Sequence, residues 1–235
     1  MRKFRTLGVL AALFTLPLTN APAHAAEAPA PITVPLHDAI AALPVAPAAS
    51  HDGYDRPTSF HHWIDSDHNR CRTREEALLA EAIEVPKKDS QCQLTGGRWY
   101  SYYDDTYVTD PGKLDIDHMV PLSQAWESGA STWSRERREA YANDLDAPRS
   151  LVAVTARSNR AKGDRDPADW MPPVQSAAVR CVYLVDWVAT KSRWGLTVDD
   201  AEGKALKDYA AQCPNLPVAY TVVPVENDAV EQAAD

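Results

Sequence analysis

Four features that are typical of common protein classes are absent from the sequence or weak in it. Its four cysteines (Cys71, Cys92, Cys181 and Cys213) include no Cys-x-x-Cys pair, which argues against a structural zinc site. No apolar run approaches the roughly 20 residues that cross a bilayer, so no membrane-spanning helix is expected. A formal charge of −9 makes the chain as a whole a poor partner for nucleic acid. No internal repeat is visible, which excludes a repeat architecture.

The first 25 residues have the pattern of a secretory signal peptide. A basic start is followed by an apolar run from Leu7 to Leu18 and by the small-residue motif Ala23-His24-Ala25. Cleavage after Ala25 would release a secreted chain; the alternative, retention as an anchor, suits a longer run than this one. In an export context four cysteines indicate two disulfides. Of the three possible connectivities, sequence proximity favours Cys71 with Cys92 and Cys181 with Cys213.

Composition divides the remaining chain into a linker, one domain and a tail. Residues 26–53 are rich in Ala and Pro, which predicts a flexible linker with at most a short helix over residues 36–43. Residues 54–213 carry the helix and strand signals and predict a single domain. Residues 214–235 are Pro-rich and then acidic, which predicts a loose tail.

Strand and helix signals alternate within residues 54–213, which predicts an α+β fold. Thr73 and Glu76 match a capping box at the start of an Ala/Leu-rich helix. Residues 91–94 and 98–103 flank Thr95-Gly96-Gly97, which predicts a β-hairpin. The other elements expected are strands over 114–118 and 151–154 and helices beginning near Pro121, Ser134, Thr155 or Ser158, Val174, and Asp199 or Thr197.

The stretch from Leu114 to Leu122 contains the residues most suited to catalysis. It places Asp117 directly before His118 in an alternating strand that Val120-Pro121 ends. Histidine suits a general base because its ordinary pKa of ~6.5 leaves it substantially neutral near pH 7. One carboxylate together with a later amide, Asn159, provides the oxygen ligands that Mg²⁺ prefers. The sequence therefore predicts a metal-dependent site at the end of this strand.

The charge of residues 135–165 differs from that of the whole chain. Basic residues outnumber acidic ones in this window, so the local field would favour a phosphate. A solvated helix face explains the basic residues at positions 135–138 equally well.

A possible calcium loop precedes the catalytic stretch. Asp65, Asp67, Asn69 and Glu76 stand at positions 1, 3, 5 and 12 of the calcium-loop pattern. Position 6, where glycine makes the sharp turn, is Arg70. A polar surface turn before the helix is the alternative reading of these residues.

Four separated segments (DIDHMVPL, YANDL, SLVAV and SNRAKGD) share their order and spacing with a known family. They resemble the HNH (ββα-metal) endonucleases, and most closely the secreted HNH family related to the C-terminal nuclease domain of GmrSD-type restriction enzymes. The likeness runs from about Trp63 through Leu206. It implies a ββα-metal core with a small β-hairpin and flanking α-helices, which the disulfides would staple.

The resemblance also implies a role for each matching residue. Asp117 and Asn159 would hold a divalent metal, Mg²⁺ with Mn²⁺ as the alternative, and His118 would be the general base. Asn143 would be the middle residue of the HNH name and would brace the histidine loop. The residues implied to bind substrate are Arg160, Lys162, Arg72 and Arg74.

The expected function is a secreted, divalent-metal-dependent endonuclease that hydrolyses phosphodiester bonds of nucleic acid, with DNA favoured over RNA. The sequence contains no zinc finger or recognition helix, which favours low sequence specificity. Cleavage of this type is expected to leave 5′-phosphate and 3′-hydroxyl ends. The alternatives are a metallohydrolase acting on another phosphodiester or a cell-envelope polymer, and a disulfide-stapled binding module in which Asp117 and His118 only structure a loop. No membrane partner is expected.

Overall fold

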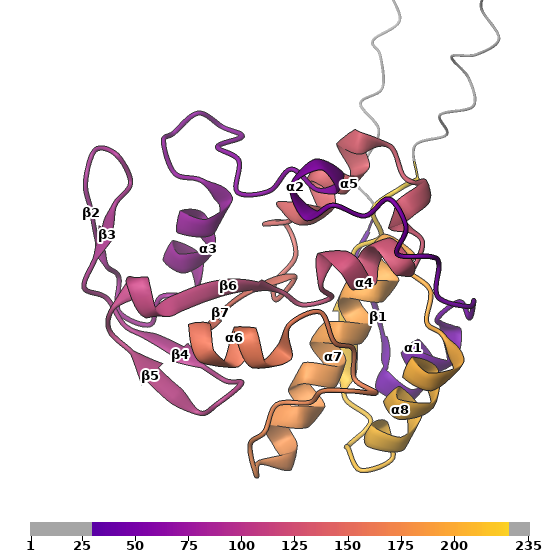
Figure 1. Cartoon of the computed structure of the whole chain (residues 1–235). Helices are drawn as coiled ribbons and strands as arrows, with labels where there is room; N and C mark the ends of the chain where they lie inside the picture. The colour runs from indigo at the N-terminus through magenta and orange to yellow at the C-terminus, as the bar shows by residue number, and fades with distance from the viewer. Residues whose placement is uncertain (1–29, 226–235) are drawn as a thin grey trace, which may run out of the picture.

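The computed structural model describes residues 30–225, which form a mixed α and β structure (Figure 1). The predicted signal peptide lies outside the described residues. Within them the strands form four two-stranded antiparallel sheets, in agreement with the predicted α+β class. Disulfides join Cys71 to Cys92 and Cys181 to Cys213, which confirms the pairing that sequence proximity favoured.

A β-hairpin followed by a short helix stands in the middle of the chain. Strand β6 (Leu114–His118) pairs antiparallel with β7 (Leu151–Thr155), and helix α6 (Ala156–Lys162) begins where β7 ends. The hydroxyl of Thr155 accepts a hydrogen bond from the backbone N–H of Ser158 and so caps α6, as predicted. Helix α6 packs against both strands, which makes a continuous hairpin and helix unit.

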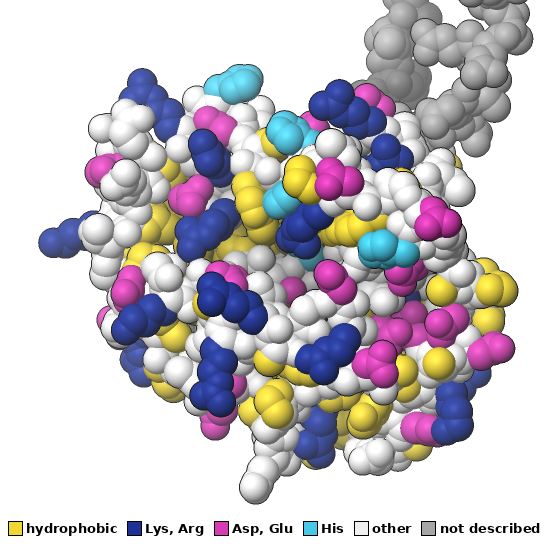
Figure 2. Space-filling view, viewed as in Figure 1, with side chains coloured by type: hydrophobic (Ala, Val, Ile, Leu, Met, Phe, Trp, Pro, Cys, Tyr) yellow, Lys and Arg dark blue, Asp and Glu magenta, His cyan; other side chains and the backbone are white. Residues whose placement is uncertain are grey.

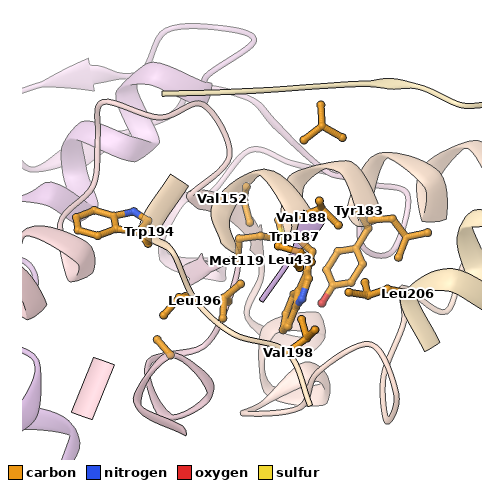
Figure 3. Close-up of a cluster of buried hydrophobic side chains, with 14 of the residues drawn as sticks. Leu43, Met119, Val152, Tyr183, Trp187, Val188, Trp194, Leu196, Val198 and Leu206 are labelled. Atoms are coloured by element: carbon orange, nitrogen blue, oxygen red, sulfur yellow. The ribbon is translucent and has the colours of Figure 1, made fainter. Parts of the chain in front are cut away.

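The long helix α7 (Ala177–Trp194) supplies much of the main core. Tyr183 and Trp187 are fully buried and lie in one cluster with residues of α8 (Asp200–Ala210) and of the catalytic stretch (Figure 3). The turn after α7 reverses at Gly195, whose φ of +67° favours glycine. The helix predicted to begin near Val174 is confirmed and begins at Ala177.

Three further helices are α3 (Thr73–Glu81), which packs against the β6–β7 hairpin, α4 (Leu122–Glu127) and α5 (Arg135–Ala142). Ser134 caps α5 through the backbone N–H of Arg137, as predicted. At α8, likewise, Asp199 accepts a hydrogen bond from the N–H of Glu202.

The capping box predicted for α3 does not form. The residue before the helix is Arg72, which makes no side-chain cap, and Thr73 is the first helical residue. The Thr73 hydroxyl instead donates to the Ile64 carbonyl and to Oδ1 of Asn143. These tertiary hydrogen bonds replace the local bonds that the sequence pattern indicated.

The predicted linker contributes to the fold. Strand β1 (Ile32–Pro35) pairs with β8 (Pro217–Tyr220), and helix α1 (Leu36–Ala42) follows β1. Leu36 and Ile40 are buried in the main core. The structure thus differs from the prediction of a flexible segment over 26–53 and of a loose tail from 214, because two chain ends far apart in sequence pair with each other.

The small strands between α3 and β6 also pair differently from the prediction. Strand β2 (Lys87–Lys88) pairs with β3 (Leu94–Thr95), and β4 (Trp99–Ser101) pairs with β5 (Thr106–Val108). Gly96-Gly97 therefore lies between two separate hairpins, whereas the sequence predicted that it forms the turn within a single hairpin. The remaining short elements are α2 (Arg56–Ser59) and two 3₁₀ turns, η1 (Pro111–Lys113) and η2 (Ala130–Thr132).

Candidate active site at the end of strand β6

Asp117 lies in a buried ion pair on the face of β6 that α6 covers. Its Oδ2 accepts a 2.7 Å hydrogen bond from the hydroxyl of Tyr103 and lies 2.5 Å from Nζ of Lys162. Lys162 also donates to the His118 carbonyl at 2.8 Å, and its side chain is fully buried. Burial raises the pKa of the Asp117 carboxyl, while the Lys162 ammonium opposes that shift. Lys162 thus ties α6 to the end of the strand.

This position of Lys162 differs from the substrate-binding role that the resemblance implied. A side chain with 0% exposure, bonded to two groups of β6, is not available to contact a phosphate. Sequence reasoning missed this because the i, i+3 spacing of Asn159 and Lys162 does not say which of the two reaches Asp117.

His118 lies at the last position of β6, and its side chain points away from Asp117 because neighbouring residues of a strand alternate. Its Nε2 is 2.9 Å from the carbonyl oxygen of Ala142. A carbonyl only accepts, so Nε2 must carry the hydrogen and Nδ1 keeps its lone pair. Nδ1 has no hydrogen-bond partner within residues 30–225. The imidazole is therefore oriented as a base, with its acceptor nitrogen available.

The surroundings of His118 keep it neutral. Burial, aided by the positive charge of Arg56, lowers the pKa of His118 to about 3. The indole of Trp63 lies against the imidazole, with ring centroids 5.1 Å apart and planes tilted by 30°, and the ring of His62 is 6.2 Å away. Trp63 has a φ of +60°, a conformation that costs free energy in a non-glycine residue and often occurs at functional sites.

Asn143 braces this arrangement without touching the imidazole of His118. Its Oδ1 accepts from the backbone N–H of Ile64 at 3.2 Å and from Thr73 at 2.7 Å. Its Nδ2 donates to the carbonyls of His61 and Glu139. Asn143 thus fixes the segment that carries Trp63 over His118, and the residue before it, Ala142, supplies the carbonyl that orients the base.

Asn159 faces the same side of β6 as Asp117, but the two side chains form no hydrogen bond with each other. Nδ2 of Asn159 donates to Oδ2 of Asp115 at 3.1 Å, and Nε of the exposed Arg160 is 4.0 Å from that same oxygen. Asp115 was absent from the sequence prediction, although period-two alternation places it on the face of Asp117. Two carboxylates therefore face α6, not one.

The donor atoms on this face fit a hard divalent cation. Oδ1 of Asp117 and Oδ1 of Asn159 have no hydrogen-bond partner in the described part of the chain. Carboxylate and amide oxygens are the ligands that Mg²⁺ accepts, together with several waters. Groups of three or more His, Cys, Asp or Glu side chains that could hold a metal are absent from residues 30–225, so a metal here would depend on few protein ligands.

The substrate-binding role of Arg72 and Arg74 stays a prediction. They line a polar pocket with Arg70, beside the Cys71–Cys92 disulfide, and the lining includes neither Asp117 nor His118. Arg74 donates to the carbonyls of Pro111 and Leu114 and so supports the start of β6.

The predicted calcium loop is held together by an amide. Nδ2 of Asn69 donates to Asp67 at 2.8 Å and to Glu76 at 2.9 Å, and the backbone N–H of Arg70 donates to Asp65. Arg70 adopts a φ of +75°, so the turn forms without glycine. Calcium binding at Asp65, Asp67, Asn69 and Glu76 stays a prediction.

The chain was compared with known proteins. Residues 72–208 match the model of a family described as GmrSD restriction endonucleases, C-terminal domain, and the match spans more than half of the chain. The chain belongs to this family. The GmrSD C-terminal domain match includes Asp117, His118, Asn143 and Asn159 and indicates a nuclease-like function. Tyr54, Arg56 and Trp63 lie before the matched region.

The similarity to one relative extends beyond that region. A protein of Arthroderma benhamiae (strain ATCC MYA-4681 / CBS 112371), named as an uncharacterized secreted protein, is 39% identical over 215 residues, covering 90% of this chain and 100% of its own. No solved structure matches the chain. None of the helices in residues 30–225 has the length and apolar character needed to cross a bilayer.

Proposed function

We propose that this protein is a secreted, divalent-metal-dependent endonuclease that hydrolyses phosphodiester bonds of nucleic acid with low sequence specificity, DNA more readily than RNA. The observation that carries the proposal is the state of His118. The imidazole is neutral, its Nε2 is bonded to the Ala142 carbonyl, and its Nδ1 has no partner in the described chain. Family membership and the β6-β7-α6 unit, which has the order of a ββα-metal core, support it.

The reaction at this site begins with a water molecule beside Nδ1 of His118. As the water oxygen attacks phosphorus, its proton passes to Nδ1, and the bond from phosphorus to the 3′ oxygen breaks. The leaving 3′ oxygen takes a proton from solvent water, and the imidazolium then releases its proton to solvent. The products are a 5′-phosphate and a 3′-hydroxyl. Trp63 keeps the imidazole in place during the transfer, and the Ala142 carbonyl stabilises the imidazolium that forms.

Asp117 and Asn159 would hold the metal ion through their Oδ1 atoms. When bound, the ion supplies positive charge against the phosphate oxygens and the leaving oxygen. Lys162 and Tyr103 both bond to Oδ2 of Asp117, which leaves Oδ1 for the ion. Asp115 holds the amide of Asn159 by its nitrogen, which leaves the amide oxygen for the ion.

The test is digestion of supercoiled plasmid by the purified secreted chain with Mg²⁺, with EDTA, and as His118→Ala. Loss of a general base is expected to lower the nicking rate about 10²- to 10⁴-fold. His51→Ala is the matched control, because His51 is an exposed histidine that pairs with Glu127. A single-stranded RNA in the same assay measures the preference for DNA. Equal nicking by wild type and His118→Ala, or activity in EDTA equal to that in Mg²⁺, would show that the mechanism is wrong.

A further inference from the structure

Arg56 lies outside the region that matches the family and close to the candidate active site. It is the first residue of α2, a one-turn helix whose preceding residue, Asp55, accepts a hydrogen bond from the N–H of Thr58. Its side chain is exposed. Figure 1 shows α2 beside α5, on the side of the molecule where β6 ends.

The helix that carries Arg56 is anchored to the same element that orients His118. Phe60, at the end of α2, is fully buried, and its ring lies 5.9 Å from that of Tyr141 in α5. Nε of Arg138, also in α5, donates to the Ser59 carbonyl at 2.8 Å. Ala142, the last residue of α5, holds His118. Arg56 and the catalytic imidazole are therefore positioned by one helix.

Arg56 lies close enough to three groups of the site for its charge to affect their pKa values. Its positive charge acts on the carboxylate of Asp117, on the imidazole of His118 and on the ammonium of Lys162. These three groups are buried, whereas Arg56 is exposed. Figure 2 shows a hollow over the end of β6, with Lys or Arg, His, hydrophobic and Asp or Glu side chains around it.

A structural role alone does not explain this arginine. No ion pair joins Arg56 to a carboxylate anywhere in residues 30–225, although other arginines of this region do form such pairs. The side chain of Arg56 is hydrogen-bonded to the hydroxyl of Tyr54, which is a neutral partner. An exposed guanidinium with no anionic partner, beside a neutral base, is suited to an anionic ligand.

We infer that Arg56 is a catalytic residue that binds the scissile phosphate at the site of His118. This inference rests on the proposed function and deepens it. The two N–H edges of the guanidinium match the non-bridging oxygens of a phosphodiester, and charge placed there stabilises the extra negative charge of the pentacovalent transition state. Since Lys162 is buried in the Asp117 ion pair, Arg56 supplies the phosphate contact that Lys162 was expected to make.

The experiment distinguishes a contact with the scissile phosphate from a contact with the neighbouring phosphates of the nucleic acid. Wild type, Arg56→Ala, Arg56→Lys and Arg135→Ala are assayed with Mg²⁺ on plasmid DNA and on bis(p-nitrophenyl) phosphate, a diester with no neighbouring phosphates. Arg135, an exposed residue of α5, controls for the loss of one positive charge. Arg56→Ala is expected to lower kcat/KM about 10- to 100-fold on both substrates. Arg56→Lys is expected to be more active than Arg56→Ala but less active than wild type, because the lysine ammonium carries the charge without the two parallel N–H donors of the guanidinium. Arg135→Ala is expected to match wild type on the small diester.

Equal turnover of the small diester by wild type and Arg56→Ala overturns the inference, even if plasmid cleavage slows. A wild type that cleaves neither substrate overturns the proposed function, and the inference falls with it. Thermal melting checks that each variant is folded, and Arg56→Gln, which keeps the side-chain length without the charge, replaces Arg56→Ala if the latter melts early. The Gln variant is expected to show the same loss on both substrates, and wild-type activity in it also overturns the inference.

Discussion

The buried ion pair between Lys162 and Asp117 makes a quantitative prediction about stability. Lys162→Met keeps the length of the side chain but removes the ammonium from Oδ2 of Asp117 and from the His118 carbonyl. Asp117 would then keep only the hydroxyl of Tyr103 at that oxygen. Removing one partner of a buried pair typically costs about 3–5 kcal/mol, since the other charge is left uncompensated. We expect Lys162→Met to lower the free energy of unfolding by that amount near pH 8.

The size of this loss should depend on pH, with a sign that follows from the carboxyl group. Burial already raises the pKa of Asp117 in the presence of Lys162, and removal of the ammonium raises it further. A carboxyl whose folded pKa exceeds its unfolded value favours folding below the unfolded pKa, and that contribution is lost as pH rises through the folded pKa. The penalty of Lys162→Met should therefore grow with pH, by at most ~1.4 kcal/mol per pH unit.

Urea unfolding of wild type, Lys162→Met, Asp117→Asn and the double variant at pH 5 and pH 8 measures both effects. The double variant should be more stable than Lys162→Met at pH 8, because no buried charge remains unpaired. Lys204→Met is the control, since Lys204 and Asp208 form an exposed pair whose loss should cost under about 0.5 kcal/mol. A loss below about 1 kcal/mol for Lys162→Met, or equal losses at the two pH values, would refute the assignment of a buried charged pair.

Local signals in the sequence predicted many of the elements correctly. The caps at Ser134, Thr155 and Asp199 form as expected, and Gly195 ends α7, because each depends on side-chain or backbone geometry within one turn. The disulfides also followed from proximity along the chain.

Features that depend on distant parts of the chain were missed. Residues 26–53 were predicted as a linker because the pairing of β1 with β8 joins segments that no local sequence signal connects. The sequence shows that Leu36 and Ile40 are apolar, but their burial depends on the C-terminal strand and α7, which the sequence does not place beside them. Thr73 had a suitable capping pattern and still bonded to Asn143, because tertiary contacts competed with the local motif.

The residues of the candidate site also fall into two groups: those that local sequence signals predicted and those that depend on distant parts of the chain. Asp117 and His118 lie at the end of β6, and Asn159 lies in α6. The sequence predicted both elements, and so these three residues could be predicted as well. Period-two alternation would also have found Asp115. Tertiary contacts place the segment of Trp63 against His118 and hold the helix of Arg56 to α5, so no pattern near the histidine indicates either residue.

Two further predictions concern the turn at Gly97 and the acid sensitivity of His118. At Gly97, where φ is +88°, an added Cβ would lie 2.6 Å from Trp99 and 2.9 Å from Pro86, so Gly97→Ala should cost at least ~2 kcal/mol in urea unfolding. A Cβ added at Gly96 would lie in open space, so Gly96→Ala should cost only ~1 kcal/mol. Equal costs for the two variants would mean that the contacts with Trp99 and Pro86 do not affect stability. His118 has a folded pKa of about 3 against 6.5 unfolded, so its contribution to stability is complete above pH 6.5 and is lost as pH falls toward 3. Between pH 7 and pH 4, wild type should therefore lose about 3 kcal/mol more than His118→Asn, which has no imidazole to protonate. Parallel pH profiles for the two proteins would mean that the imidazole becomes charged without unfolding, and hence that burial does not lower its pKa.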